Sequence, residues 1–540
     1  MSKTFKKPPE LLAFTGFLWY NNNMKNINDA ENEKRITELE NKITGLEALV
    51  KFYEEQFRLS KHRQFGQSSE KTVLPEQLSL FDEAEATADP KAPEEVKIEE
   101  ITYTRKKRIG KRADDLSKLP VETIIYELDE SECICPECNG KLHSMSTEER
   151  CEIEIIPAQF VAKRHLQHIY ACRNCEKHND HVPIIKASAP EPVIKGSLAS
   201  PSAVAHIMVE KYVKAVPLYR QEQCLLRDGV NLSRQTMANW IIRCAQDWLL
   251  PVYEHMKKVM LLEQVLHADE TVVQVLCEPG KKANTNSYEW LYRTSGCAVY
   301  PIVLYEYQPT RSSSHPKKFL SGWEGFLHTD GYKGYHQLPN VIIVACFAHA
   351  RRKFNDALKA MPMNLRTGSM AEKGLTYCNQ LFELERVFEE LSQEQRHLKR
   401  LEKSLPIAEE LLTLAGTFGN QPKSVTKTAM DYYIGQWPYL KNIFIDGRLE
   451  PSNNRAERSI KPFVIGRKNW LFSNSQKGAM ASSVVYSIIE TAKENGLNPF
   501  NYLVFLFERM PNHMGRSLDD FMPWDSFVQE HCKVVSYDGG

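Results

Sequence analysis

Residues 264–271 read Gln-Val-Leu-His-Ala-Asp-Glu-Thr, an apolar, β-rich run that ends in two acidic residues. A second run, at residues 325–329, leads into Asp330 and the stretch Gly-Tyr-Lys-Gly-Tyr. Each run predicts a strand with an aspartate at its end. Glu457 has a different setting, because it follows Pro-Ser-Asn-Asn at residues 451–454, a turn and N-cap signal that predicts the start of a helix.

Asp269, Asp330 and Glu457 together indicate a metal site, which none of them would indicate alone. Among 69 Asp and Glu residues, most are expected to be solvated surface charges, and an aspartate at a strand end is often a turn residue. Two strand-borne aspartates and one helix-borne glutamate can, however, supply the carboxylate oxygens that Mg²⁺ or Mn²⁺ prefers. Two such ions, roughly 4 Å apart, can activate an attacking oxygen and stabilise a leaving one in phosphodiester chemistry.

The rest of a mixed sheet is predicted around these runs. Three further strands are expected at residues 288–293, 299–307 and 341–347. The first two would form its antiparallel part, and the last leads into a helix at Ala348. With this strand count the fold class is α/β multidomain, with a ribonuclease-H-like mixed-sheet core at residues 259–495. Residues 354–448, rich in Leu, Glu, Lys and Arg at helical spacing, predict a helical insertion in that core.

Two pairs of cysteines predict a structural zinc site. The chain has 13 cysteines and no recognisable secretory signal, so a reduced compartment is expected instead of a disulfide framework. Two C-x-x-C knuckles separated by a strand-rich stretch are typical of a zinc ribbon, here at residues 131–185. The four thiolates that would close a tetrahedral Zn²⁺ site belong to Cys135, Cys138, Cys172 and Cys175. Free buried thiols are the alternative, and Cys133, His178 and His181 complicate the choice of ligands.

Helices with two short interruptions are predicted at residues 198–255, within a DNA-binding region at residues 186–258. One helix starts at Pro217, a turn follows at residues 229–231, and Ser233 caps the next helix, which is a helix-turn-helix pattern. The start of the second helix can meet base edges and phosphates in a major groove. The candidate DNA contacts are Arg220, Arg234, Gln235, Thr236 and Asn239. Such patterns also occur by chance in helical regions, so packing alone is the alternative.

An apolar heptad repeat predicts a coiled coil at residues 31–65. Its a and d positions alternate in steps of three and four residues. They are Ile36, Leu39, Ile43, Leu46, Val50, Tyr53 and Phe57. This seam predicts a homodimer or higher oligomer, whereas an amphipathic helix packed on the same chain is the alternative.

The segments on either side of the repeat are expected to carry little structure. Residues 1–30 are expected to be a disordered extension, and translation from Met24 would remove most of them. Residues 66–130 are expected to be a linker that is first acidic and then basic.

Overall charge does not point to a nucleic-acid partner, because 69 Lys and Arg residues balance 69 Asp and Glu residues. Local clusters of basic residues are more informative about a nucleic-acid partner. Arg351 and Arg352 follow the predicted strand at residues 341–347, and Arg458 and Lys461 follow Glu457. Beside a phosphodiester site these cations would bind the phosphates of a DNA backbone, although a solvent-facing helix start is the ordinary interpretation.

Three segments resemble the insertion-sequence 66 family of bacterial D-D-E transposases in order and context. They are residues 269–271, residues 329–335 with Cys-Phe-Ala-His-Ala-Arg-Arg at 346–352, and residues 453–462. The stretch Pro-Leu-Tyr-Arg-Gln at residues 217–221 is also similar to the family. The resemblance extends from about Ile36 to Trp524 and includes a C-terminal module at residues 496–540.

The resemblance implies a cytoplasmic DNA transposase that binds double-stranded DNA, both the terminal inverted repeats of its element and a target. Asp269, Asp330 and Glu457 would hold two Mg²⁺ (or Mn²⁺) ions, water would free a 3′-hydroxyl, and that hydroxyl would attack target DNA in line. The family usually works with small accessory proteins encoded in the same element.

Two alternatives from other classes stay open. One is a DNA-binding regulator derived from a transposase with an inactive core, and the other is a metal-dependent nuclease without strand transfer. No membrane partner is expected, since no segment is long and apolar enough to span a bilayer.

Overall fold

The computed structural model divides the chain into two compact units. The first holds residues 1–77, 191–221 and 233–533, and the second holds residues 78–190, 222–232 and 534–540. The residues that the structure describes are 11–65, 160–171, 184–419, 421–513, 515 and 517–534.

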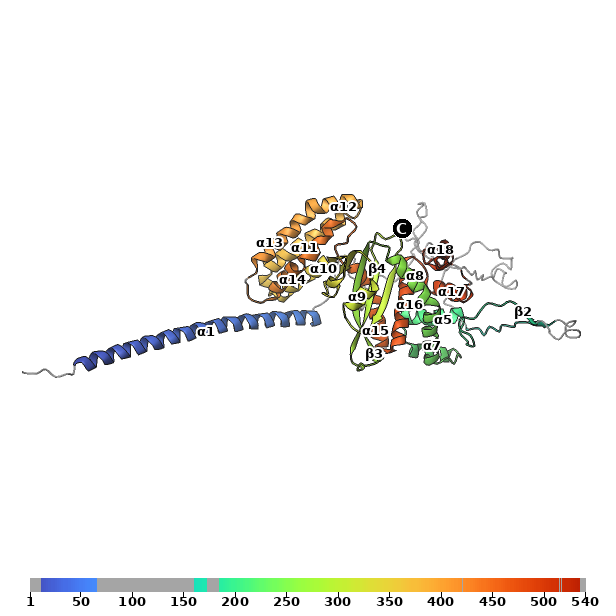
Figure 1. Ribbon diagram of the computed structural model, residues 1–540, viewed down its shortest axis with the longest axis horizontal. Coiled ribbons are helices and arrows are strands. Elements are labelled where there is room, and N and C mark those ends of the chain that lie inside the picture. Colours follow the sequence, from blue (N-terminus) through green and yellow to red (C-terminus); the bar gives the residue numbers. More distant parts are fainter. Residues whose placement is uncertain are drawn as a thin grey trace, which may run out of the picture. The chain divides into compact units, whose positions relative to one another are not determined.

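A six-stranded mixed sheet forms the core of the first unit (Figure 1). Its strands are β3 (Val265–Cys277), β4 (Asn286–Thr294), β5 (Val303–Gln308), β6 (Gly325–Thr329), β7 (Val341–Ala345) and β8 (Ser473–Ser475). The order is β5-β4-β3-β6-β7, with antiparallel pairing from β5 to β3 and parallel pairing from β3 to β7. The short strand β8 pairs with the far end of β3. The prediction of a mixed sheet is therefore confirmed.

Two strands differ from their predicted bounds. β3 does not end at Asp269 but continues to Cys277, because it pairs with β4 well beyond the three residues that pair with β6. Asp269 thus lies inside a strand, just past the end of the parallel ladder. β5 begins at Val303 instead of near residue 299, and Pro301, which has no N–H to donate to a ladder, lies just before it.

Helices cover both faces of the sheet. One face carries α15 (Asn454–Trp470) and α16 (Gln476–Glu494). Thr491 of α16 both accepts from and donates to the backbone of Val303, at 3.0 and 2.9 Å, and so satisfies part of the open edge of β5. On the other face, the ring of Tyr292 stacks on Phe319 of α9 (Ser314–Phe319) at 3.7 Å.

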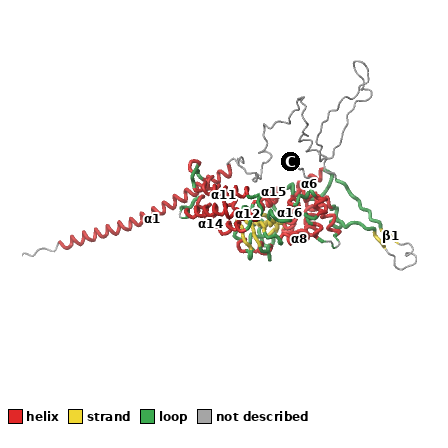
Figure 2. The backbone as a smooth tube through the Cα atoms, turned by 90° about the horizontal axis from the view of Figure 1, so that it is seen from above, coloured by secondary structure: helices red, strands yellow, loops and turns green. Residues whose placement is uncertain are grey.

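A helical region lies between β7 and α15, where the insertion was predicted (Figure 2). Its helices are α10 (Phe347–Ala360), α11 (Met370–Val387), α12 (Gln393–Lys399), α13 (Leu405–Thr417) and α14 (Val425–Leu440). The buried guanidinium of Arg400 bonds both carboxylate oxygens of Glu385, at 2.8 and 2.6 Å, and the carbonyl of Asp446 at 3.2 Å. This pair ties α11 to the segment that leads back to α15.

Further helices flank the core in sequence. They are α5 (Pro201–Tyr212), α6 (Leu218–Arg227), α7 (Arg234–Cys244), the π-turn η2 (Ala245–Leu249), α8 (Leu250–Met260), α17 (Pro499–Arg509) and α18 (Ser526–Cys532). The two predicted interruptions fall at residues 213–217 and 228–233. Ser233 caps α7 as expected, because its hydroxyl accepts the N–H of Thr236 at 3.2 Å.

The helix α1 (Leu11–Phe65) is continuous, so the prediction of disorder is wrong for residues 11–30. No proline interrupts this stretch, and the backbone hydrogen bonds of the helix can therefore propagate through it. Near its C-terminal end α1 packs on the helical insertion, where Leu59 is buried and the Glu55 carboxylate accepts the N–H of Val425 at 2.9 Å.

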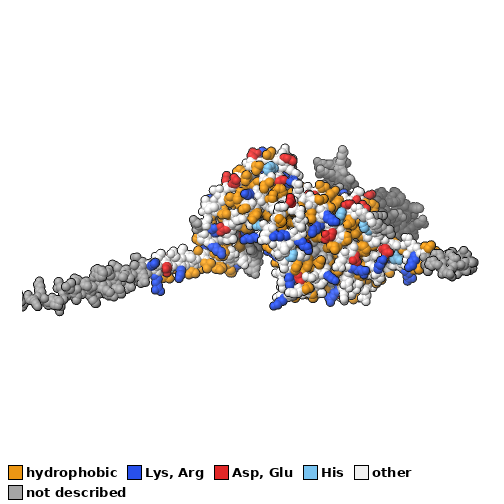
Figure 3. All heavy atoms as spheres, in the orientation of Figure 1, with side chains coloured by type: hydrophobic (Ala, Val, Ile, Leu, Met, Phe, Trp, Pro, Cys, Tyr) orange, Lys and Arg blue, Asp and Glu red, His pale blue; other side chains and the backbone are white. Residues whose placement is uncertain are grey.

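The predicted heptad seam of α1 is largely exposed beside that packing, although Ile43, Leu46 and Val50 line a groove that the helical insertion borders. Its seven side chains are between 52% and 62% exposed, and hydrophobic side chains are visible on the surface of α1 in Figure 3. Packing on the same chain therefore uses mainly another set of residues, and the coiled coil stays a prediction.

In the second unit, β1 (Ile169–Ala171) pairs with β2 (Ile184–Lys186) in an antiparallel ladder. The four predicted zinc ligands lie outside the described residues. Among the helices that the structure describes, none has the length and apolar character to cross a membrane.

Candidate active site

Strand register places two of the predicted acids on one face of the sheet. His267 of β3 pairs with His328 of β6, and these two rings stack at 4.4 Å between centroids. Side chains two positions apart on a strand share a face. Asp269 lies two residues after the first histidine and Asp330 two residues after the second. The two carboxylates therefore follow a pair of stacked, buried imidazoles at the end of the parallel ladder.

Negative charge accumulates at this place. Burial raises the pKa of Asp269 well above its usual range, and the neighbouring charges of Glu270, Asp330 and Glu457 raise it further. The N–H of Glu270 donates a hydrogen bond to the Asp269 carboxylate at 2.8 Å and lowers the pKa only in part. Carboxylates in this condition fit a divalent cation, which would neutralise them.

Asn453 connects the helix of Glu457 to this face. It occupies the N-cap position of α15, yet its side chain makes no capping bond to that helix. Instead its amide contacts the ring of His267 at 3.0 Å and donates to the carbonyl of Ala268 at 2.9 Å, while its own N–H donates to the sulfur of Cys346 at 3.2 Å. The N-cap residue of the helix is thus bonded to β3 and to the residue that follows β7. Glu457 follows one turn later.

The half-buried side chain of Glu450 lies beside the stacked histidines. Glu450 lies 3.6 Å from the second ring nitrogen of His267, and its N–H donates to His328 at 3.3 Å. Burial lowers the pKa of His328 well below its usual range, and the adjacent His267 lowers it further. Although burial opposes the shift, contacts with His267 and Arg455 lower the pKa of Glu450. This acid is therefore ionised and structural.

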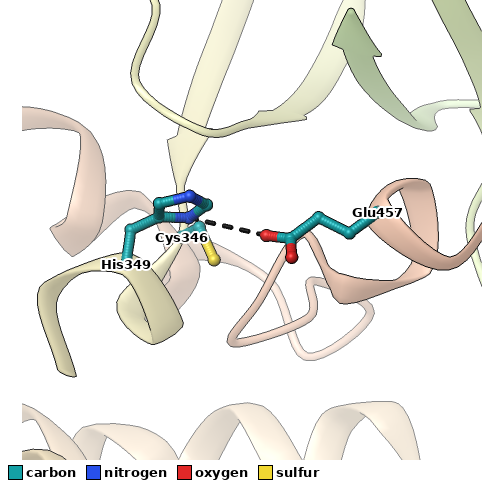
Figure 4. A group of neighbouring side chains, drawn as sticks. All are labelled: Cys346, His349 and Glu457. Carbon is teal, nitrogen blue, oxygen red and sulfur yellow. Dashed lines mark ion pairs between the residues drawn. The ribbon is translucent and has the colours of Figure 1, made fainter. Parts of the chain in front are cut away.

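A thiol, an imidazole and a carboxylate meet beside the two aspartates (Figure 4). Cys346 directly follows β7, His349 lies on the first turn of α10, and Glu457 approaches from α15. Their ligand atoms all lie within 4.8 Å of one another. Burial raises the pKa of Cys346 to about 11, although the N–H groups of Asn453, His349 and Ala348 oppose the shift.

The three predicted acids are less tightly gathered than this group. In the part of the chain that the structure describes, the group of Cys346, His349 and Glu457 is the one set of three metal-ligating side chains with such close ligand atoms. Asp269 and Asp330 share a face and interact electrostatically with Glu457, but do not form such a set with it. Arg352 lies 3.5 Å from Glu457 and 3.3 Å from His349, so a cation already neighbours the glutamate.

Sequence reasoning missed the partners of Glu270. This side chain projects to the opposite face of β3, where it accepts from Arg311 at 2.8 Å and from the hydroxyl of Tyr335 at 2.6 Å. Its position directly after Asp269 is the only signal in the sequence, since alternation sends neighbouring residues to opposite faces.

The remaining predicted contacts are found at several places on the first unit. Four of the five predicted contacts on α6 and α7 are exposed: Arg220, Arg234, Gln235 and Asn239. The fifth, Thr236, is half-buried at the start of α7. Arg351 bonds the side chain of Asn379 at 2.6 Å. Arg458 is exposed and Lys461 is half-buried on α15, the helix of Glu457. Exposure leaves these groups accessible to a phosphate backbone.

Comparison with known proteins places this site in a family. Residues 196–481 match the model described as Transposase IS66 family, and residues 487–524 match the IS66 C-terminal element. Residues 132–176, which include the two C-x-x-C pairs, match the zinc-finger binding domain of transposase IS66. Residues 53–124 match a fourth model, Transposase C of IS166 homeodomain.

Two proteins of Sinorhizobium fredii are similar in sequence to most of this chain. The uncharacterized protein y4jD is 30% identical over 427 residues, which is 75% of this chain and 80% of that protein. The uncharacterized protein y4hP is 29% identical over 490 residues, or 85% and 86% of the two chains. The family match spans the sheet, the helical insertion and all three predicted acids. The chain therefore belongs to the IS66 family of transposases.

Proposed function

We propose that this chain binds the terminal inverted repeats of its own insertion sequence and catalyses metal-dependent cleavage and strand transfer of DNA. The observation that carries the proposal is the placement of Asp269 and Asp330 on one face of adjacent parallel strands, with the helix of Glu457 bonded to the first of them, β3, through Asn453. The family supports a transposase that binds DNA and uses a divalent metal.

The strand arrangement supports a ribonuclease-H-like core. Three antiparallel strands are followed by two that join in parallel, giving the order β5-β4-β3-β6-β7. In such a sheet the carboxylates that follow the parallel ladder would lie near one another, and the register of β3, β6 and β7 supports this arrangement.

In the proposed reaction Asp269, Asp330 and Glu457 hold Mg²⁺ ions, which when bound would activate the attacking oxygen and stabilise the leaving one. The chain itself positions these ligands. Asn453 holds the start of α15 against β3 and so orients Glu457. Arg352, beside Glu457, is placed to contact a phosphate next to the reacting one.

DNA binding is proposed for two regions. Arg234, Gln235, Thr236 and Asn239 stand on the first turns of α7, with Arg220 on α6, and would meet a groove and its phosphates. The second region is the zinc ribbon, and the zinc-finger match at residues 132–176 supports it. Its structural Zn²⁺ would be held by Cys135, Cys138, Cys172 and Cys175.

The exposed seam of α1 supports self-association with a second copy of the chain. Ile43, Leu46 and Val50 line an apolar groove of about 600 Å³ together with Met361 and Leu365. A seam of heptad spacing that its own chain leaves open fits the same seam of another copy.

The mass in solution tests this pairing. Lysines at the a positions, Ile43→Lys with Val50→Lys, should lower the mass measured by light scattering toward that of one chain, 62.2 kDa. Thr44→Lys, on an outer position of α1, is the matched control and should leave the mass unchanged. An unchanged mass in the double variant would remove the coiled coil from the proposal.

A strand-transfer assay tests the catalytic proposal. The full chain is mixed with a labelled duplex that carries the inverted repeat flanking its gene, a target plasmid and Mg²⁺. Joined product should form with the wild type and with Asp431→Asn, an exposed acid of α14, but not with Asp330→Asn, which should still shift the duplex in a gel. Cleavage without joining would favour the nuclease, and binding without metal-dependent chemistry would favour the regulator or a missing accessory protein.

A further inference from the structure

The sheet face that carries Asp269 and Asp330 also carries a thiol and an imidazole near the end of β7. Val344 of β7 pairs with His328 of β6, so Cys346, two residues later, falls on the same face as Asp330. His349 follows three residues on, at the start of α10, and so lies on the same side of that helix as Cys346. The row of carboxylates on β3 and β6 thus ends, at β7, in a thiol and an imidazole.

Two atoms of this group face each other as an ion pair but without a hydrogen bond. Nδ1 of His349 lies 3.7 Å from Oε1 of Glu457, and in the described part of the chain both atoms are buried without a hydrogen bond. Figure 4 shows the ring and the carboxylate pointing toward one another with the sulfur of Cys346 beside them. Buried polar atoms are normally satisfied, so a facing set without a hydrogen bond calls for a ligand.

The donor set selects the kind of ion. Mg²⁺ takes oxygen ligands, whereas Zn²⁺ takes thiolate, imidazole and carboxylate together in tetrahedral sites. In such a site the ligand atoms lie about 3.5 Å apart, which follows from Zn–ligand distances of about 2.0 to 2.3 Å. The observed 3.7 Å between His349 and Glu457 needs only a small rotation of either side chain.

We propose that Cys346, His349 and Glu457 form a second cation site, for Zn²⁺, which shares Glu457 with the magnesium site. Occupancy by zinc would withdraw Glu457 from Asp269 and Asp330, and the two metals would exclude each other. The exclusion rests on the proposed function, since it requires Glu457 to be a magnesium ligand. Zinc binding itself does not, because it needs neither DNA nor catalysis.

Zinc content of the full chain tests the site directly. Protein dialysed against buffered free Zn²⁺ is measured for zinc per chain, and the affinity of the last ion is obtained by titration against a chromophoric chelator. Cys346→Ala and His349→Ala should each bind one ion fewer than the wild type at limiting zinc. Outer-shell partners of a metal contribute about 10- to 100-fold in affinity, so loss of a ligand should cost at least as much. Any zinc held by the ribbon cysteines would be the same in all variants.

Two controls separate this site from its neighbours. Cys378→Ala removes another buried thiol, on α11, and Asp269→Asn removes an acid of the magnesium site; neither should change the zinc content. His349 is partly exposed, so its variant keeps the test valid if Cys346→Ala fails to fold. Equal zinc content in wild type and His349→Ala would overturn the proposal, and so would loss of the ion in Asp269→Asn. Failure of strand transfer alone would count only against the proposed function.

Discussion

Asp269 and Glu270 are adjacent in sequence but serve on opposite faces of β3. Glu270 is nearly buried, and its charge is balanced by Arg311 and by the hydroxyl of Tyr335. In the described part of the chain Asp269 has no such cation, and its neighbours are further acids. Burial raises the pKa of both carboxylates, but Tyr335 and Arg311 oppose the shift at Glu270, whereas neighbouring acids add to it at Asp269. The carboxylate that lies among like charges is the one available to a metal.

The largest effect should be the loss of cleavage when the charge of Asp269 is removed. Asp269→Asn should reduce cleavage by at least about 100-fold, because a metal ligand is lost. Its thermal midpoint should stay equal or rise, since the ionised carboxylate is disfavoured in the folded chain. Cleavage assays in Mg²⁺ and thermal denaturation measure both quantities.

Glu270→Gln should show the reverse pattern. Glutamine offers one acceptor oxygen, so either Arg311 or the hydroxyl of Tyr335 loses its acceptor. Because burial disfavours the charged form of Glu270 and raises its pKa, removal of that charge offsets part of this loss, and the free energy of unfolding should fall by about 1 kcal/mol. Folded Glu270→Gln should retain cleavage activity. A variant that keeps its stability but loses cleavage would contradict the division of roles.

Asn453 and Asn454 give a second contrast. Asn453→Ala removes two side-chain hydrogen bonds and leaves His267 and the carbonyl of Ala268 unpaired, which should cost about 2 to 4 kcal/mol of stability. Asn454 is half-buried, and its backbone N–H donates to the hydroxyl of Ser452, a bond that alanine keeps, so Asn454→Ala should cost less than about 0.5 kcal/mol. Thermal midpoints of the two variants, measured side by side, check the difference. Equal losses would show that the network does not hold α15.

The smallest expected effect is a pH dependence. Because the pKa of Asp269 is raised from 3.8 in the folded chain, that chain binds more protons than the unfolded one above this pH. The wild type should therefore lose stability relative to Asp269→Asn as the pH rises above about 4, in the absence of divalent metal. Saturating Mg²⁺ should remove the difference. Thermal midpoints of both proteins from pH 4 to 8 test this, and parallel curves without metal would contradict it.

Local patterns predicted several elements well because their signals lie in neighbouring residues. The strands at β4, β6 and β7, the cap at Ser233 and the helix of Glu457 follow from alternation, turn residues and capping chemistry. The end of β3 was misplaced because its continuation depends on pairing with β4, which lies elsewhere in the sequence. The helix at residues 11–30 was missed because its composition has no amphipathic repeat, whereas absence of proline was the better guide.

The candidate site was predicted in part for the same reason. The motif around Asp269 identifies a candidate acid. The residues next to Asn453 and Glu450 do not predict that Asn453 bonds β3 instead of capping its helix, or that Glu450 lies beside the two histidines. These contacts join residues more than 100 positions apart. Only the register of the sheet brings them together.

The sequence by itself determined the family and the candidate side chains: the three acids, the heptad seam and the cysteine pairs. The tertiary structure decided which of these side chains share a face, which acids are satisfied and where Cys346 and His349 meet Glu457. The physical reason is that residue type and capping act over a few positions, whereas strand register and burial are set by long-range pairing.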